Sequence, residues 1–558
     1  MRTSASAPRS QSLILAAAFA AAFLLTALVG VWASYDRSNA WPAFALIALG
    51  LLLSTGIIWA GRRWGETALG VMSLAVALLA GAIGVYFLLA YNWSDNAGEI
   101  ELLQRIGQAV QAYRPAITLP TDINANVAAS GLTVTLFLGL GGLVWAFRYR
   151  WWIGLVVAGL AWLAGLVALI LAQSRGAWIS VGVGLVAILY LTLRRRWADH
   201  RGLRIVLDLL ALATLLAFVA FFVAAVRTPD LASFLGSTAV GTSAINRATL
   251  WRDGLALVGD YPFTGSGLRS TMMVYSTYDL LMHVGFILHM HNLFVQIAVE
   301  QGIIGLLALV GLLAAAIANL LAATRVARPV WRFSLPAGAA LTALISHGLV
   351  DAGLYGSSIA FVLFLPVGLA LAIDPGGSKE QHGRLDWPLV IAAVAVVAMA
   401  LVVFLPAGRS AFQANLGTVA QTRAELSRYT WPEWPIQDDL RRSPEIDLGP
   451  AIARYQAALA TNPSNASASR RLAQVELARG DYAAARAHLE TSYAAAPSNR
   501  ATRQLLAELY AIDGESQRAA EMLSTVDTSL NQLDLRVFWY THIGEPEKAD
   551  RLKQLVGQ

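Results

Sequence analysis

The residues of this chain that could do chemistry are arginines, histidines and carboxylates that border long apolar runs. Arg175 stands between two such runs. Arg247 and Trp251 are four residues apart and share one face of a predicted helix, and Arg252 is adjacent to Trp251. Guanidinium groups bind anions through paired hydrogen bonds; the alternatives are an arginine that reaches lipid headgroups and a solvated loop charge. These residues are candidates for binding an anionic substrate group.

A polar stripe is predicted at the start of a later apolar helix. His289, Asn292, Gln296 and Glu300 fall at i, i+3, i+7 and i+11. Glu300 would lie on the order of 13 Å below the helix start, so it needs a partner or a water-filled cleft, a structural hydrogen bond being the plainer alternative. His291 is offset from the stripe, so helical geometry alone favours His289 as the reactive imidazole.

His347 and Asp351 are four residues apart where a further helix reaches the same side. This spacing fits either a histidine–carboxylate pair or a helix-end cap. No histidine or carboxylate cluster has zinc-ligand spacing, and Asp253, Asp260 and Asp279 follow no repeated ligand motif. The sequence therefore predicts no metal and no cofactor.

The composition indicates that a membrane holds these residues in place. Of 558 residues, 57% are hydrophobic and 14% are charged, and the mean hydropathy is +0.56. The absence of cysteine excludes disulfides, thiolate catalysis and cysteine-ligated zinc. The net charge of +6 comes largely from basic residues in short loops between apolar runs, a pattern that encodes membrane topology and does not favour nucleic acid as a partner.

Eleven apolar runs are predicted as membrane helices because each approaches the ~20 residues that cross a bilayer. They cover residues 12–33, 41–60, 67–91, 126–147, 151–172, 176–193, 205–226, 291–322, 333–350, 355–373 and 387–406. With a cytoplasmic N-terminus, the inside loops hold sixteen basic residues and the outside segments before the tail hold eight. The long loops 92–125 and 227–290 are then outside, and residues 246–258 are predicted as a short helix along the membrane face. An odd number of spans also places the C-terminal tail outside.

The predicted domains are a membrane domain at 1–410, a linker at 411–447 and a helical solenoid at 448–558. In the tail, Pro463 and Pro497, Asn465 and Asn499, Ala473 and Ala507, and Gly480 and Gly514 are each 34 residues apart. This period is typical of tetratricopeptide repeats, whose concave surfaces bind peptides or protein partners. We expect an all-α protein: a polytopic helical bundle followed by a soluble tetratricopeptide-like solenoid.

Several motifs resemble those of a known family. Arg247-Ala-Thr-Leu-Trp251, Tyr261-Pro-Phe-Thr-Gly-Ser-Gly267 and His291-Asn-Leu-Phe through Glu300-Gln-Gly302-Ile-Ile-Gly305 resemble, in this order, the bacterial O-antigen ligases and polymerases. Ser174-Arg175-Gly176-Ala177 and the stretch from His347 to Asp351 are also similar to elements of that family. The resemblance covers the membrane region and leaves out the tail.

The resemblance implies a GT-C-like glycosyltransferase of the bacterial inner membrane. Such an enzyme transfers a glycan from a polyprenyl pyrophosphate carrier, of the undecaprenyl type, to an acceptor hydroxyl at the outer face, with inversion and without a metal. Arg175 and Arg247 would then stabilise the pyrophosphate, and His291 would be the base. Further candidates for substrate contact follow from the patterns above: Arg252, Trp251, His289, Asn292, Glu300, His347 and Asp351.

The motifs leave the acceptor open. Lipid A core, a second carrier-linked glycan or a protein hydroxyl would make the protein a ligase, a polymerase or a protein O-oligosaccharyltransferase. A transporter with Glu300 in its path and a non-catalytic scaffold are alternatives of other classes. Family members commonly have twelve spans with both termini inside, whereas eleven are predicted here. The tail is expected to recruit an acceptor protein or an assembly partner.

Overall fold

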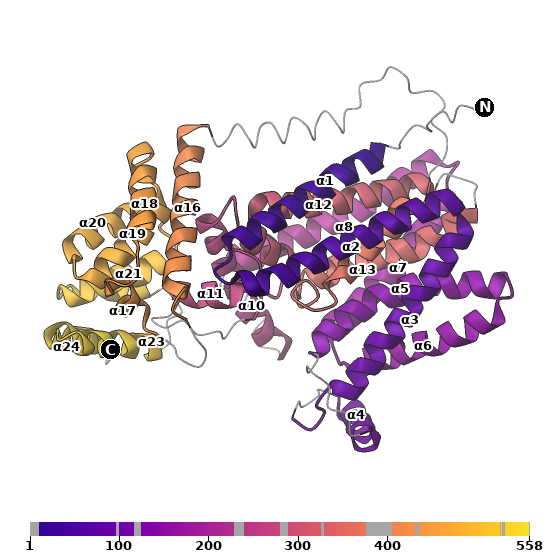
Figure 1. Ribbon diagram of the computed structural model, residues 1–558, viewed down its shortest axis with the longest axis horizontal. Coiled ribbons are helices and arrows are strands. Elements are labelled where there is room, and N and C mark those ends of the chain that lie inside the picture. The colour runs from indigo at the N-terminus through magenta and orange to yellow at the C-terminus, as the bar shows by residue number, and fades with distance from the viewer. Residues whose placement is uncertain are drawn as a thin grey trace.

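The computed structural model describes residues 11–95, 100–115, 124–227, 239–279, 288–324, 329–374, 404–429, 435–524, 526 and 530–556. Within these ranges the secondary structure is helical and contains no strand. A bundle of long apolar helices is joined at one end to a compact group of shorter helices formed by the C-terminal part of the chain (Figure 1). This is an all-α polytopic membrane protein, as the sequence predicts.

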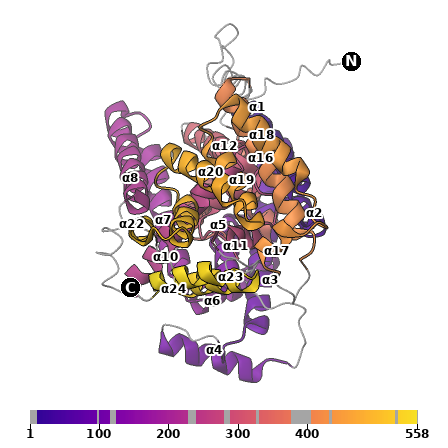
Figure 2. The ribbon, with the colours of Figure 1, turned by 90° about the vertical axis from the view of Figure 1, so that its left-hand side faces the viewer.

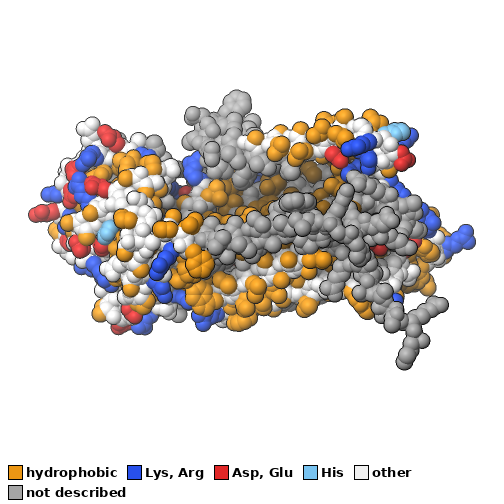
Figure 3. Space-filling model, turned by 90° about the horizontal axis from the view of Figure 1, so that it is seen from above, with side chains coloured by type: hydrophobic (Ala, Val, Ile, Leu, Met, Phe, Trp, Pro, Cys, Tyr) orange, Lys and Arg blue, Asp and Glu red, His pale blue; other side chains and the backbone are white. Residues whose placement is uncertain are grey.

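Seven of the predicted spans are helices long and apolar enough to cross a membrane. They are α1 (Gln11–Ala33), α2 (Arg37–Trp64), α3 (Glu66–Ala90), α5 (Ala125–Arg148), α6 (Trp152–Leu171), α7 (Arg175–Arg196) and α12 (Leu293–Ala323). The predicted span at 205–226 lies within α8 (Arg201–Arg227). Large apolar side chains such as Leu52, Ile153 and Val186 are exposed on these helices, as expected of a surface solvated by lipid. Figure 3 shows the resulting apolar band, with charged side chains gathered towards the two ends of the molecule.

The ninth and tenth predicted spans are shorter than expected. The ninth consists of a 3-10 turn, η1 (Pro329–Phe333), and α13 (Ser334–Gly348), which is roughly 22 Å long. The tenth, predicted at 355–373, is helical only in η2 (Ala360–Phe364) and α14 (Leu365–Ala372). Residues 352–355 are buried although they are not helical, and irregular backbone is tolerated at membrane depth where protein surrounds it. The eleventh prediction, 387–406, falls mostly outside the described residues.

The basic loops and the C-terminal helices lie at opposite ends of the bundle. At the end of α1, the ring of Trp32 contacts Arg423 in the C-terminal part. The ring centroid lies 4.6 Å from the guanidinium carbon. α2 starts a few residues later and runs for 28 residues, about 42 Å. In its last turn Arg62 donates to the Leu371 carbonyl. Arg195 stacks on Trp331 at 4.0 Å at the end of α7. The charge asymmetry in the sequence therefore corresponds to a separation in space.

The two long loops contain helices of their own. The first contains α4 (Glu101–Tyr113), which the sequence analysis did not predict. In the second, the predicted helix at 246–258 is part of a longer one, α10 (Ala239–Asp260), and is followed by α11 (Thr271–Asp279). The α10 helix lies between the bundle and the C-terminal helices and contacts both α12 and α16.

The C-terminal part is a stack of helix pairs. Its helices are α16 (Pro406–Leu426), α17 (Gln437–Arg442), α18 (Gly449–Thr461), α19 (Ala466–Arg479), α20 (Tyr482–Ala495), α21 (Arg500–Ile512), α22 (Ser516–Leu523), α23 (Leu530–His542) and α24 (Pro546–Val556). α16 packs on α18, so much of the predicted linker 411–447 is helical and belongs to this stack (Figure 2). The 34-residue period has a local cause, because Asn465 and Asn499 cap α19 and α21, and Gly480 and Gly514 follow those helices at positive φ. The tetratricopeptide assignment stays a prediction.

Candidate functional site

The Tyr261–Gly267 motif is built into a break in α12. Gly302 has a φ of 75°, so the helix kinks there. The Ile303 N–H, freed by the kink, donates to the Pro262 carbonyl at 2.9 Å, and the Ser266 N–H donates to the Val299 carbonyl at 2.7 Å. A Cβ on Gly302 would lie 2.8 Å from the carbonyl oxygens of Pro262 and Phe263. The two motifs of the resemblance thus complete each other's backbone hydrogen bonds and fix the loop to the helix.

The segment before α12 is held by hydrogen bonds to side chains. Asn292 caps the helix by accepting from the Phe294 and Val295 N–H groups at 3.0 and 3.1 Å. Its Nδ2 donates to the Leu349 carbonyl at 3.0 Å, which joins the start of α12 to the end of α13. Trp251 on α10 donates from Nε1 to the Met290 carbonyl at 2.9 Å. Between these anchors the backbone of His291 is left-handed, with a φ of 46°. Such strain in a residue other than glycine tends to cluster at functional sites.

His289, His291 and Asp351 form a compact cluster. One potential ligand atom from each lies within 4.8 Å of the others. The His291 Nδ1 is 3.6 Å from the Asp351 Oδ2, and neither atom has a hydrogen-bond partner among the described residues. The His289 Nδ1 accepts from the His291 N–H at 3.2 Å, so a neutral His289 carries its proton on Nε2. The gap between His291 and Asp351 is wider than a hydrogen bond and can close when a substrate binds.

The loop after α13 orients Asp351. Its N–H donates to the His347 carbonyl at 2.9 Å, and its Oδ1 accepts from the Gly353 N–H at 2.7 Å. His347 is buried and shares a hydrogen bond of 3.0 Å with the Ser130 hydroxyl of α5. His347 and Asp351 are thus adjacent, but Asp351 points its free oxygen at His291. No sequence pattern predicts the contribution of Ser130, since it lies inside an apolar run.

Two arginines complete the cluster from other helices. Arg247 on α10 is half-buried and interacts electrostatically with Asp351 and Arg175. Arg175 is the exposed first residue of α7, whose N-terminus is capped by Ser174. A Cβ on the next residue, Gly176, would be 3.8 Å from the His347 Nε2, which places the start of α7 beside the cluster. The structure therefore brings Arg175, Arg247 and His291 together from three separate segments.

The electrostatics of the cluster follow from burial and from these charges. Burial lowers the pKa of His289 to about 4, with His291 and Arg247 acting in the same direction and Asp351 opposing them. Burial alone would raise the pKa of Asp351, but His291, His289, His347 and the Gly353 N–H outweigh it and hold that pKa below the usual value. At neutral pH the site therefore combines a neutral His289 with an ionised Asp351.

Three predicted residues lie apart from this cluster. Trp251 is buried and positions the histidine segment through Met290, as described above. Arg252 is exposed on another face of α10. Glu300 is 3% exposed and accepts from Thr271 at 2.9 Å and Gln296 at 2.8 Å, inside a network between α11 and α12. Asn292, which caps α12, lies on the predicted polar stripe with Gln296 and Glu300. His289 does not, because it precedes the cap and α12 begins only at Leu293.

Two imidazoles and a carboxylate at this spacing could also hold a zinc ion. The guanidinium of Arg247 interacts with the same carboxylate, so a cation would have to bind next to a positive charge. The donor set alone is compatible with a metal and the electrostatics oppose one. The expected absence of a metal stays a prediction.

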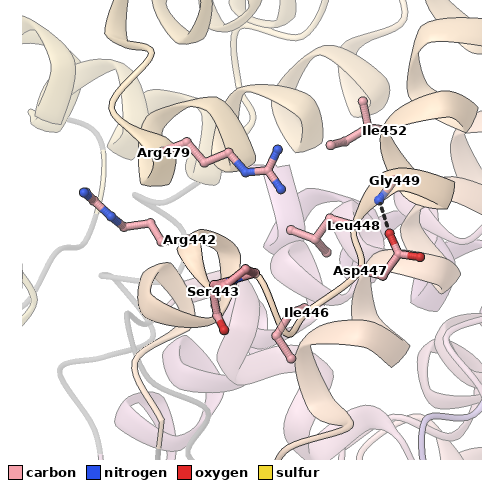
Figure 4. Close-up of a pocket in the computed structure, with 9 residues that line it drawn as sticks. Arg442, Ser443, Ile446, Asp447, Leu448, Gly449, Ile452 and Arg479 are labelled. Atoms are coloured by element: carbon pink, nitrogen blue, oxygen red, sulfur yellow. Dashed lines mark hydrogen bonds between the residues drawn. The ribbon is translucent and has the colours of Figure 1, made fainter.

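A separate cavity of about 630 Å³ lies in the C-terminal stack (Figure 4). Arg442, Asp447, Leu448 and Arg479 are among the residues that line it. Arg442 and Arg479 also donate to the carbonyls of Ala478 and Arg441, which ties both arginines into the stack. None of the predicted site residues lines this cavity.

Comparison with known proteins finds one matching family model. The family model of the O-antigen ligases matches residues 160–310. The matched region includes Arg175, Arg247, His289 and His291, and ends before His347 and Asp351. No curated protein matches the chain. The family match supports glycan transfer of the O-antigen ligase or polymerase type, with a lipid-linked glycan donor and an acceptor. Residues 160–310 are therefore similar to the O-antigen ligase family.

Proposed function

We propose that this protein transfers a glycan from a polyprenyl pyrophosphate carrier to an acceptor hydroxyl on the outer side of the bacterial cytoplasmic membrane. The observation that carries the proposal is the meeting of two guanidinium groups with an imidazole–carboxylate pair at the end of the bundle that faces away from the basic loops. Phosphate recognition and proton transfer are the two tasks that this reaction requires.

In the proposed reaction His291 is the base. The acceptor oxygen attacks the anomeric carbon, its proton passes to the His291 Nε2, and the bond between the anomeric carbon and the pyrophosphate oxygen breaks with inversion. His291 is 37% exposed at its side chain and can reach an acceptor. Burial lowers the pKa of His289 to about 4, which makes His289 a weak base. Asp351, on the Nδ1 side, stabilises the imidazolium that forms. This geometry favours His291 over His289.

Arg247 and Arg175 stabilise the leaving pyrophosphate. Negative charge develops on it as the glycosidic bond breaks, and fixed guanidinium groups balance that charge without a metal ion. The two arginines interact with each other unfavourably in the absence of substrate, and a bound pyrophosphate would relieve that repulsion. The enclosure of Glu300 by Thr271 and Gln296 speaks against a transport path through this residue.

The test is transfer in vitro with purified carrier-linked glycan and a panel of acceptors: lipid A core, a second carrier-linked glycan and a protein. The product mass identifies the acceptor class and so separates ligase, polymerase and protein O-oligosaccharyltransferase. His291→Ala and Arg247→Ala should each reduce transfer by at least about 100-fold. Arg105→Ala is the matched control, because Arg105 is an exposed arginine of α4 that pairs with Glu101 one turn away on the same helix. Transfer by His291→Ala at the rate of the control would refute the proposed base.

A further inference from the structure

The α10 helix, which carries Arg247, is held on two different faces. Arg247, Trp251 and Gly254 lie within roughly 60° of one another around its axis, and this face meets the segment before α12. Asp253 and Asp260 are seven residues apart and lie about 130° away on the wheel. The second face therefore points away from the histidine cluster, and its aspartates need other partners.

The C-terminal stack supplies those partners. Asp253 is 1% exposed and accepts from Arg500 of α21 at 3.0 Å, as well as from the Tyr275 hydroxyl at 3.0 Å. Asp260 is 3% exposed and pairs with Arg470 and Arg471 of α19. Both arginine side chains are 1% exposed. Breaking such a pair would leave an uncompensated buried charge, so these ion pairs fix the position of the stack relative to α10.

A second set of contacts with the stack lies directly after α10. Asn415 of α16 accepts from the Phe263 and Thr264 N–H groups at 2.9 and 3.2 Å, and donates to the Thr264 hydroxyl at 2.7 Å. The Tyr261 hydroxyl hydrogen-bonds Thr422 of the same helix at 2.6 Å. The stack thus fixes both the last turns of α10 and the loop motif that docks into the kink of α12.

We infer that the C-terminal helical stack is a positioning element for the transfer site of its own chain, because it fixes α10 and thereby Arg247 relative to His291. This inference rests on the proposed function. It assigns Asp253, Asp260, Arg470, Arg471 and Arg500 as positioning residues. It differs from recruitment of an acceptor protein, since recruitment would leave the place of α10 unchanged.

The first test substitutes Arg500 in the full-length protein. Arg500→Gln removes the ion-pair partner of Asp253 and should lower kcat/KM for the carrier-linked donor about 10- to 100-fold, because a small misplacement of a group that stabilises the leaving pyrophosphate is costly. The KM for the acceptor should not change. Arg500→Lys keeps the charge and should recover most of the loss. Arg486→Gln is the matched control, since Arg486 forms ion pairs with Asp513 and Glu515 inside the stack and is not part of the grip on α10.

The second test measures the position of α10 without any substrate. The chain has no cysteine, so Gly259→Cys on α10 and Gly182→Cys on α7 can be spin-labelled as a unique pair. A Cβ at either glycine meets no atom within 4 Å, so the labels can be accommodated. The distance distribution between the labels should be narrow in the otherwise unaltered protein and in Arg486→Gln. It should broaden or shift in Arg500→Gln.

The outcomes separate this inference from the proposed reaction. A broadened distribution in Arg500→Gln, with no glycan transfer by any form of the protein, would support the positioning role and refute the reaction. An unchanged distribution together with unchanged transfer would overturn the positioning role. If Arg500→Gln raised only the KM for a protein acceptor and left the label distance on α10 unchanged, recruitment would be favoured and the positioning role would again be overturned.

Discussion

The charge of Asp351 offers a sharp test of the proposed base. Asp351→Asn keeps the shape of the side chain and an oxygen that can still accept from the Gly353 N–H. It removes the negative charge 3.6 Å from the His291 Nδ1. The imidazolium formed during transfer would then lose its nearest counter-charge, while the fold of the loop after α13 is kept.

The size of the effect follows from the distance. At 3.6 Å the attraction between unit charges is about 1 kcal/mol in water and about 5 kcal/mol at an effective dielectric constant near 20. The His291 side chain is 37% exposed, so screening by solvent brings the expected loss to about 2–3 kcal/mol. Such a loss corresponds to a kcat roughly 30- to 150-fold lower.

The same substitution should not weaken donor binding. Asp351 also offsets the charge of Arg247, so its neutralisation leaves that guanidinium freer to attract pyrophosphate. We therefore expect kcat to fall while the KM for the donor stays level or decreases, as measured by steady-state transfer in detergent or nanodiscs. Asp351→Asn with a kcat within threefold of the unaltered protein, and an unchanged melting temperature, would refute the role of the carboxylate.

Three further predictions concern stability, pH and metal. Gly302→Ala should lower the unfolding free energy by at least about 1–2 kcal/mol, because a φ of 75° is strained for alanine and its Cβ would clash with Phe263; Gly56→Ala, where a Cβ meets nothing, is the control in thermal unfolding. Burial lowers the pKa of His289 to about 4, so as the pH falls the histidine is protonated in the unfolded chain before it is protonated in the folded protein. About 3 kcal/mol of stability should therefore be lost between pH 6.5 and pH 4. This loss should be smaller in His289→Asn by denaturant titration at each pH. Transfer should survive exhaustive chelation, and recovery of a lost rate by added zinc would contradict the metal-free mechanism.

The sequence by itself determined the membrane character, most of the helices and the identity of the motifs. An apolar run of about 20 residues matches the thickness of the hydrocarbon layer. The membrane-spanning helices α1, α2, α3, α5, α6 and α7 could therefore be predicted closely from the sequence. The 34-residue spacing of Asn465 and Asn499 likewise reflects local capping, which needs no distant contact.

Only the tertiary structure decided how these elements meet. Helical periodicity favoured His289 in a polar stripe, but the Asn292 cap starts α12 at Leu293 and leaves His291 on a strained backbone facing Asp351. Residues 355–359 of the tenth predicted span are not helical, and hydropathy cannot distinguish such a segment from a helix. The contacts of Arg470, Arg471 and Arg500 with Asp260 and Asp253 of α10 join residues more than two hundred positions apart. Such contacts depend on which helix ends become neighbours after folding, and no local pattern in one sequence encodes that choice.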